Sequence, residues 1–269
     1  MHRLIIAAAL IATAFAASAE DQPNPMLPGG SWDDLRYDIA QDAELKDGSA
    51  LFDVAAPYRA HDAAIVPVTI TQIDPDAPRI ERVMLVIDEN PAPLAATITF
   101  GAAMHPLDFE TRIRVNQYSN VRVLADTATG TYMNGRFVKA SGGCSAPATK
   151  DPAQALATMG QMRLKLFGDP AVQQSVARRE AQVMIRHPNY SGLQRDQITQ
   201  LFVSAHFISA LEVRQGDDVL FSLEGGISIS ENPVFRFWYS DNGSPALTVR
   251  AVDTDGNVFQ QDLPKMPPA

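Results

Sequence analysis

A repeated alternation of apolar and polar residues over short runs constrains the fold of this chain more than any other feature of its sequence. Pro, Gly, Asn or Asp lies between the runs, which is typical of turns between β-strands. In the first half the runs span residues 65–73, 79–87, 95–100, 111–115, 119–125 and 132–140. In the second half they span residues 181–186, 203–214, 219–223, 235–239 and 247–251. Short, closely spaced strands of this kind predict β-sandwiches rather than an α/β fold.

Two short helices are predicted outside these runs. Ser31 is a candidate N-cap, because it precedes acidic residues and an apolar helical face made by Trp32, Leu35 and Ile39. Asp151-Pro152 is a second helix start, and the apolar spacing predicts a helix that continues to about Phe167. Near the C-terminus, Asp255-Gly256 predicts a tight hairpin between the last two strands.

The first nineteen residues have the pattern of a secretory signal peptide. A short basic start containing Arg3 is followed by an apolar stretch at 4–17 and by the small residues Ala17-Ser18-Ala19. The apolar stretch is too short for a stable membrane span, which disfavours the alternative of a retained anchor. We therefore expect a mature chain that begins at Glu20 and is located in the periplasm of a Gram-negative host.

The chain is acidic and carries a net negative charge. With 22 Lys and Arg against 31 Asp and Glu, the net charge is −9, and removing Arg3 with the leader makes it about −10. An acidic surface disfavours binding to nucleic acids and to anionic membranes.

The chain has a single cysteine, Cys144. A chain bound for an oxidising compartment would pair its cysteines, but Cys144 has no partner within the chain. Gly142 and Gly143 come directly before it, and the residues Ser145, Ala146 and Pro147 that follow are also small. We therefore expect an exposed thiol on a flexible stretch of backbone.

Basic residues near Cys144 in the sequence, Arg136, Lys139 and Lys150, would favour its thiolate form if they lie close to it. The alternative is a buried, inert free cysteine, which is the usual state of unpaired cysteines. The absence of large apolar residues between positions 139 and 150 argues against that alternative.

Several motifs, in order along the chain, resemble the two subunits of a sulfur-carrier complex. Ser141-Gly142-Gly143-Cys144 is similar to the Gly-Gly-Cys-Gly tail that carries sulfur intermediates in the SoxY family, and residues 65–68 and 111–115 look like strands of that family. Downstream, residues 187–192, 205–208 and 230–235 resemble SoxZ. The order is similar to that of the fused SoxYZ-like carriers found alongside quinoprotein dehydrogenases.

This resemblance implies a mainly β fold, with two immunoglobulin-like β-sandwich domains joined by a Cys-bearing segment and a short helix. The expected boundaries are 1–19 for the signal peptide, 31–145 for the SoxY-like domain, 146–172 for the linker and helix, and 173–265 for the SoxZ-like domain. Apolar strand faces would hold the two domains together. In the SoxY family the cysteine lies on a free C-terminal arm, whereas here a second domain follows it.

The resemblance also implies a function without catalysis or cofactors. Cys144 would attach sulfur-containing cargo covalently, and Gly142 and Gly143 would form the flexible arm. The partners would be periplasmic sulfur-oxidising proteins, or quinoprotein dehydrogenases and their cytochromes. Two alternatives are a non-covalent accessory protein of a quinoprotein alcohol dehydrogenase, and a thiol that traps an aldehyde or sulfite.

Other chemistry is poorly supported by the sequence. The chain lacks a hydrolase nucleophile elbow, a phosphate-binding glycine loop and a dinucleotide fingerprint. The histidines after the leader are His61, His105, His187 and His206. They lack the close spacing of a zinc site, so no metal site is predicted. We expect His206 to be packed or hydrogen-bonded in a strand.

Overall fold

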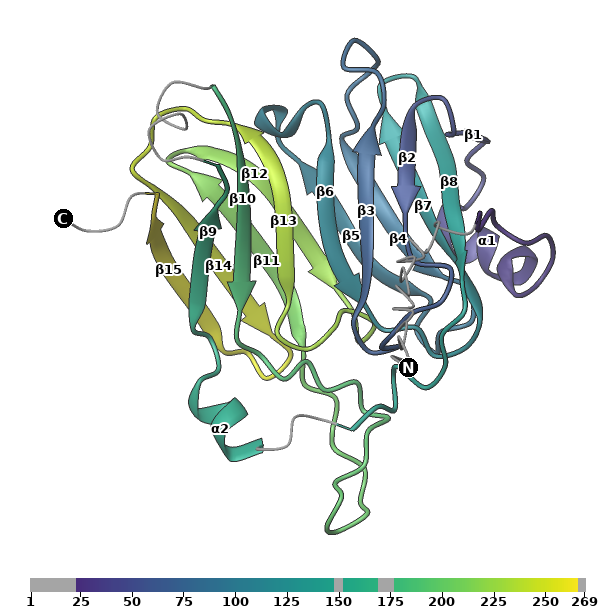
Figure 1. Cartoon of the computed structure of the whole chain (residues 1–269), viewed down its shortest axis with the longest axis vertical. Helices are drawn as coiled ribbons and strands as arrows, with labels where there is room; N and C mark the ends of the chain where they lie inside the picture. Colours follow the sequence, from purple (N-terminus) through teal and green to yellow (C-terminus); the bar gives the residue numbers. More distant parts are fainter. Residues whose placement is uncertain (1–22, 148–151, 169–176, 266–269) are drawn as a thin grey trace, which may run out of the picture.

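The computed structural model describes residues 23–147, 152–168 and 177–265, so the predicted signal peptide lies outside the described residues. Within these residues the chain is mainly β and forms two sheets that pack face to face (Figure 1). The predicted mainly β fold with two immunoglobulin-like sandwich domains is confirmed. No helix of the described residues is long and apolar enough to cross a membrane.

The larger sheet has nine strands among the described residues, in the order β1-β8-β7-β4-β5-β12-β11-β14-β15. These strands are β1 (Leu45–Asp47), β4 (Arg82–Ile87), β5 (Leu94–Phe100), β7 (Ser119–Thr127), β8 (Gly130–Val138), β11 (Ile208–Gln215), β12 (Asp218–Gly225), β14 (Ala246–Asp253) and β15 (Val258–Pro264). The pairing of β1 with β8 is parallel, and the other pairings in this sheet are antiparallel.

The smaller sheet has six antiparallel strands among the described residues, in the order β2-β3-β6-β13-β10-β9. These strands are β2 (Phe52–Ala55), β3 (Val66–Gln72), β6 (Asp108–Ile113), β9 (Met162–Leu166), β10 (Arg178–Ile185) and β13 (Val234–Ser240). The helical elements are α1 (Trp32–Ala40), η1 (Ala102–Met104) and α2 (Pro152–Ala157).

Both sheets run without a break from the first half of the chain into the second (Figure 1). In the larger sheet β5 pairs with β12 and places Phe100 opposite Phe221, and in the smaller sheet β6 pairs with β13 and places Phe109 opposite Phe237. Backbone hydrogen bonds therefore join the two halves. The sequence predicted only that apolar strand faces would hold them together. Gly101 follows β5 at this junction, where an added Cβ would lie 1.9 Å from the Val219 carbonyl oxygen.

An aromatic cluster fills the space between the two sheets at the same junction. The ring centroids of Phe100 and Phe109, from the first half, are 5.3 Å apart. Phe109 lies 5.2 Å from Phe221 and 6.2 Å from Phe235, both from the second half. Aromatic pairs at these separations contribute roughly 0.5–1.5 kcal/mol each beyond the burial of their area. The two halves thus share one continuous core.

One of the two predicted helices is shorter than the sequence pattern suggested. The predicted apolar face of α1, made by Trp32, Leu35 and Ile39, packs on the larger sheet. Ser31 forms no cap hydrogen bond and donates its hydroxyl to Glu89 instead. The second helix ends at Ala157 rather than near Phe167, because residues 162–166 form β9 and pair with β10. A hairpin between β14 and β15 is present as predicted, but four residues, 254–257, connect the strands rather than the two of a tight Asp255-Gly256 turn.

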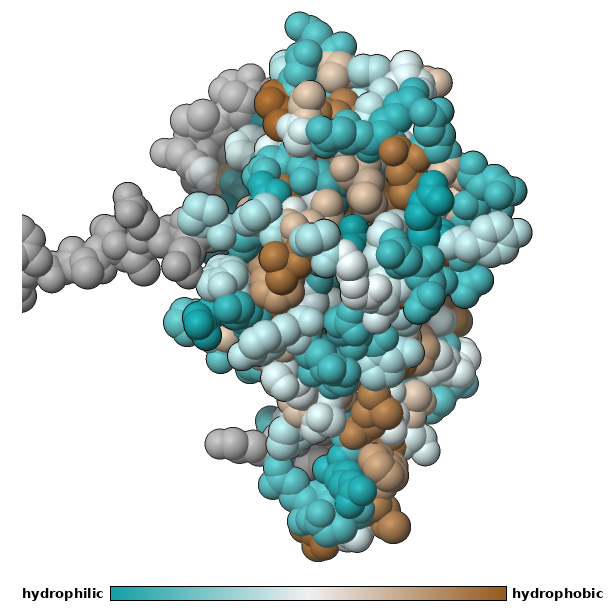
Figure 2. Space-filling view, turned by 90° about the vertical axis from the view of Figure 1, so that its right-hand side faces the viewer, coloured by the Kyte–Doolittle hydropathy of each residue, from teal (hydrophilic) through white to brown (hydrophobic). Residues whose placement is uncertain are grey.

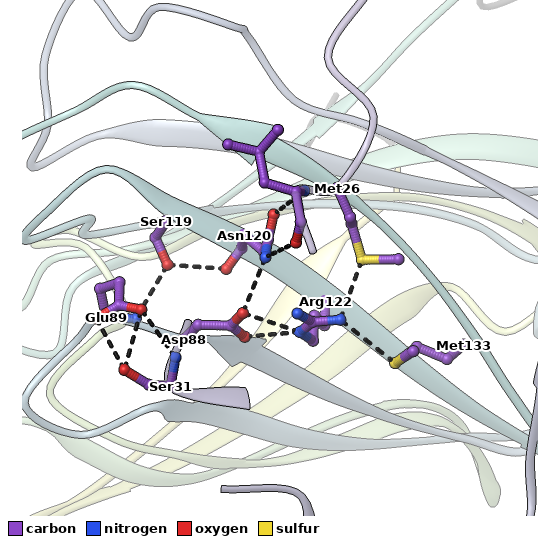
Figure 3. A network of polar contacts seen from close by, with 9 residues as sticks. Met26, Ser31, Asp88, Glu89, Ser119, Asn120, Arg122 and Met133 are labelled. Carbon is purple, nitrogen blue, oxygen red and sulfur yellow. Dashed lines mark hydrogen bonds and ion pairs between the residues drawn. The ribbon is translucent and has the colours of Figure 1, made fainter. Parts of the chain in front are cut away.

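A buried polar network fastens the N-terminal segment to the first sandwich (Figure 3). Arg122 donates to both carboxylate oxygens of Asp88, and its guanidinium lies 4.6 Å from the ring centre of Trp32. Asn120 binds the backbone of Leu27 through both its oxygen and its amide nitrogen. The segment before α1 is therefore held by side chains of β7 and of the turn after β4.

A long loop between β10 and β11 projects from the lower end of the molecule (Figure 1). Three of its apolar residues are exposed, namely Ile198, Leu201 and Phe202. Figure 2 shows hydrophobic atoms at the lower tip of the molecule, where this loop lies. The stem of the same loop contacts the segment that carries the cysteine.

Candidate functional site

The segment that carries Cys144 lies in a groove beside residues 115–116, directly after β6. The amide of Gly142 donates to the carbonyl oxygen of Asn116 at 2.8 Å, and that of Gly143 donates to the carbonyl oxygen of Val115 at 3.0 Å. An added Cβ at Gly143 would lie only 2.0 Å from the Ala63 carbonyl oxygen. In this structure the segment expected to form a flexible arm is docked by these hydrogen bonds, and Gly143 is the residue that allows the close backbone packing.

The loop between β10 and β11 covers the other side of the segment. The Ser191 hydroxyl donates to the carbonyl oxygen of Cys144, and the Gln194 amide donates to that of Ala146 at 3.0 Å. The second half of the chain thus holds the cysteine segment in place.

The side chain of Cys144 is completely buried, which corrects the expectation of an exposed thiol. The sequence around the cysteine does contain only small residues, but strands and loops distant in sequence provide its cover. Burial raises the pKa of the Cys144 thiol to about 11, and the nearby Arg114 opposes this only in part. About one thiol in ten thousand is therefore ionised at neutral pH in this conformation.

The positive charge beside Cys144 comes from Arg114 rather than from the residues that the sequence suggested. Arg114 is 1% exposed, and it donates to the carbonyl oxygens of Gly143 at 3.3 Å and of Asn189 at 3.2 Å. Arg136 instead pairs with Asp53, Lys139 lies over the ring of Tyr58, and Lys150 is outside the described residues. Sequence reasoning treated Arg114 as one residue of a strand-like run and missed it.

Two of the four histidines that follow the leader, His187 and His206, meet in the second half of the chain, close to one carboxylate. His206 Nε2 lies 2.7 Å from an oxygen of Asp253, and His187 Nε2 lies 3.4 Å from the same oxygen. His206 is thus hydrogen-bonded as expected, although it lies just before β11 rather than within a strand.

This cluster has the residue types of a metal site, since its candidate ligand atoms lie within 4.8 Å of one another. However, the Asn189 amide donates to His187 Nδ1 at 3.0 Å, so the hydrogen-bond pattern assigns the proton of the neutral ring to Nε2. The Nε2 atom that faces Asp253 then has no lone pair for a metal. We interpret the cluster as a structural hydrogen-bond network.

Asp253 is the centre of that network. Burial alone would raise the pKa of Asp253, but hydrogen bonds from Asn257, His206 and His187 together outweigh it and lower the pKa to about 2. Burial also lowers the pKa of His187, which stays neutral. Both groups therefore bind fewer protons in the folded chain than in the unfolded chain.

We expect this network to make the fold acid-sensitive. Because the pKa of His187 is depressed on folding, its unfolded form binds the extra proton, and stability falls as the pH drops below about 6.5. The Asp253 contribution is lost from about pH 4 down to about pH 2. Melting temperatures measured from about pH 7 to 5 should therefore decrease. The free energy of unfolding should fall by at most about 1.4 kcal/mol per pH unit through the protonation of His187.

The His187→Asn variant provides the test of this assignment. Its side-chain oxygen can still accept the Asn189 amide, but it cannot take up a proton, so the dependence between about pH 7 and 5 should be flatter. The exposed His61, replaced in the same way, serves as the control and should leave the slope unchanged. Equal slopes in all three proteins would show that His187 does not cause the acid sensitivity.

Comparisons with known proteins divide the chain at the cysteine segment. Residues 36–144 match the family model described as sulfur oxidation protein SoxY, and residues 170–264 match that described as sulphur oxidation protein SoxZ. Among solved structures, the sulfur carrier protein SoxY from Chlorobium limicola f thiosulfatophilum matches with 23% identity and a TM-score of 0.35, over 41% of this chain and 91% of that chain. No curated protein matches the chain.

Proposed function

The chain is a SoxYZ-like sulfur carrier with a SoxY domain and a SoxZ domain in one polypeptide, and from this premise we propose that Cys144 covalently holds sulfur-containing intermediates for partner enzymes. The protein itself would catalyse no step. Its partners would load and unload the thiol, and the two sandwiches would present it.

One observation carries the proposal: the match to SoxY ends at residue 144, the position of the single cysteine. The Gly-Gly pair directly before it is the part of the SoxY-like tail that this chain retains. The SoxZ match begins only at residue 170, so the cysteine segment occupies the junction between the two matched regions.

Transfer of cargo requires the segment to leave its groove, because the thiol is buried when the segment is docked. Among the described residues, hydrogen bonds at Gly142, Gly143, Cys144 and Ala146 hold the docked segment. Each such bond contributes about 1 kcal/mol net, so opening costs a few kcal/mol. A partner protein that binds the open form can supply that free energy.

We place this activity in the periplasm, after cleavage of the signal peptide at residues 1–19. The partners there would be sulfur-oxidising proteins, or a quinoprotein dehydrogenase with its cytochrome. The acidic charge of the chain favours neither nucleic acid nor an anionic membrane as a partner.

Replacement of Cys144 by Ser tests the carrier function. Wild-type protein purified from its native periplasm should show a mass increment that maps to Cys144, whereas Cys144→Ser should have the unmodified mass. Cells that carry the Cys144→Ser variant should also lose the growth that depends on the cargo. The Ser145→Ala variant, which keeps the thiol, is the control. Cargo or growth that survives in Cys144→Ser would contradict the proposal.

The burial of the thiol favours one alternative, a non-covalent accessory protein for a quinoprotein alcohol dehydrogenase. In that case the cysteine does no chemistry, in keeping with a pKa of about 11. Cys144→Ser would then leave growth unchanged, and the purified variant would still form a complex with the purified dehydrogenase or its cytochrome.

A further inference from the structure

Arg114 has an unusual combination of deep burial and few partners. Its guanidinium has five N–H donors, but the described residues provide only two hydrogen bonds, both long and both to neutral carbonyl groups. Its Nε atom is buried without any partner. No carboxylate of the described residues lies within 4 Å, and the charges of Glu231 and Asp62 act on it only from farther away.

Burying such a cation is energetically unfavourable. An arginine side chain stays protonated inside proteins, so it cannot escape burial by losing its charge. Burying an ion without a paired counter-charge costs several kcal/mol even after the surroundings relax. The site is therefore electrostatically incomplete as it stands, and an anion placed beside the guanidinium would stabilise it.

The guanidinium spans the groove in which Cys144 lies. One of its terminal nitrogens donates to the carbonyl oxygen of Gly143, the residue just before the cysteine. The other donates to the carbonyl oxygen of Asn189, in the loop whose Ser191 binds the cysteine backbone. Arg114 thus lies between the cysteine segment and its cover, and its charge acts on the thiol.

We propose that Arg114 is the counter-ion for an anionic group attached to the sulfur of Cys144. The cargo would then be a sulfur group that ends in a negative charge, such as a sulfonate, and the loaded segment would dock more firmly than the empty one. This inference rests on the proposed carrier function for its biological meaning, but the recognition of charge by Arg114 can be tested without it.

Two alkylating reagents of nearly equal size separate charge from bulk. Iodoacetate converts the thiol into an anionic carboxymethyl thioether, and iodoacetamide converts it into a neutral carbamidomethyl thioether; each releases iodide and a proton. Both reactions would be carried out on the full chain in denaturant, followed by refolding. The melting temperature of each adduct is then measured at low salt.

The anionic adduct of the wild-type protein should melt about 3 °C or more above the neutral adduct, because only the anion completes the Arg114 site. This difference should disappear in Arg114→Met. It should persist in Arg112→Met, which removes the same charge two residues earlier in the chain. The wild-type comparison alone decides the matter if Arg114→Met does not fold. Equal melting temperatures for the two wild-type adducts, or a difference that survives in Arg114→Met, would overturn the proposal.

Tetrathionate provides the sulfur-containing counterpart of the anionic reagent. The thiolate attacks an inner sulfur of tetrathionate, forms a new S–S bond and releases thiosulfate, which leaves a sulfonate-terminated adduct on Cys144. This adduct should be stabilised in the same Arg114-dependent way as the carboxymethyl form. Since the adducts are made in vitro, failure here leaves the carriage of cargo by Cys144 intact. Conversely, the absence of native cargo leaves this charge test valid.

Discussion

Replacing Gly143 with Ala is expected to increase the rate at which Cys144 reacts with a thiol reagent by about 100-fold. The added Cβ would lie 2.0 Å from the carbonyl oxygen of Ala63 and 2.7 Å from that of Val115. Both are backbone atoms, so the segment must leave its groove instead. Once the thiol is in water, its pKa returns from about 11 toward 9.0, and the thiolate fraction increases in proportion.

Alkylation by iodoacetamide at neutral pH, followed by mass spectrometry over time, measures this effect. A melting curve and circular dichroism must show that the variant is folded. The Ser145→Ala variant is the matched control, because it changes an exposed neighbour with a single long hydrogen bond to the Gly142 carbonyl oxygen, and its rate should stay within a few-fold of wild type. A folded Gly143→Ala protein that reacts as slowly as wild type would show that other contacts bury the thiol.

Replacing Arg122 with Met is expected to lower the free energy of unfolding by about 3–5 kcal/mol. Its guanidinium and the carboxylate of Asp88 form a buried pair, in which the side chains are 6% and 1% exposed. Without Arg122 the carboxylate keeps only the amide of Asn120 as a side-chain partner among the described residues (Figure 3). The cation–π contact with Trp32, which helps to hold α1, is lost as well.

Urea denaturation of the two proteins gives the difference directly. Arg82→Met is the control, since Arg82 pairs with Asp126 on the same sheet but is 51% exposed. An exposed pair of this kind contributes about 1 kcal/mol or less. If Arg122→Met costs no more than Arg82→Met, the buried pair does not stabilise the N-terminal segment as we infer.

The alternation of apolar and polar residues predicted most of the long strands because many of them bury mainly one face, although the first seven residues of β7 are all buried. Val66–Gln72 is typical, since its buried and exposed positions alternate along the whole strand. The strands that the sequence did not reveal, β1, β2 and β9, are three to five residues long. A run that short contains too few positions to distinguish a strand from a helix or a loop, and its partner strand decides its structure. This explains why residues 162–166 resembled the end of a helix.

The candidate site was predictable in identity but not in environment. Cys144 could be found because it is the single cysteine and follows two glycines. Its burial could not be found, because Ser191 and Gln194 are more than forty positions away in the chain. Arg114 was likewise hidden, since it follows a regular strand and only the folded structure places it in the groove.

The pairing of β5 with β12 and of β6 with β13 determines how much of the molecule can move when the thiol is delivered. A carrier made of two separate subunits can change their relative orientation, but here two backbone ladders and a shared aromatic core lock the halves together. Separating the two halves would leave unpaired edges on β5, β12, β6 and β13, and such edges promote aggregation. Under the proposed carrier function, delivery would therefore come from local movement of the few residues around Cys144 and not from a rearrangement of the two halves.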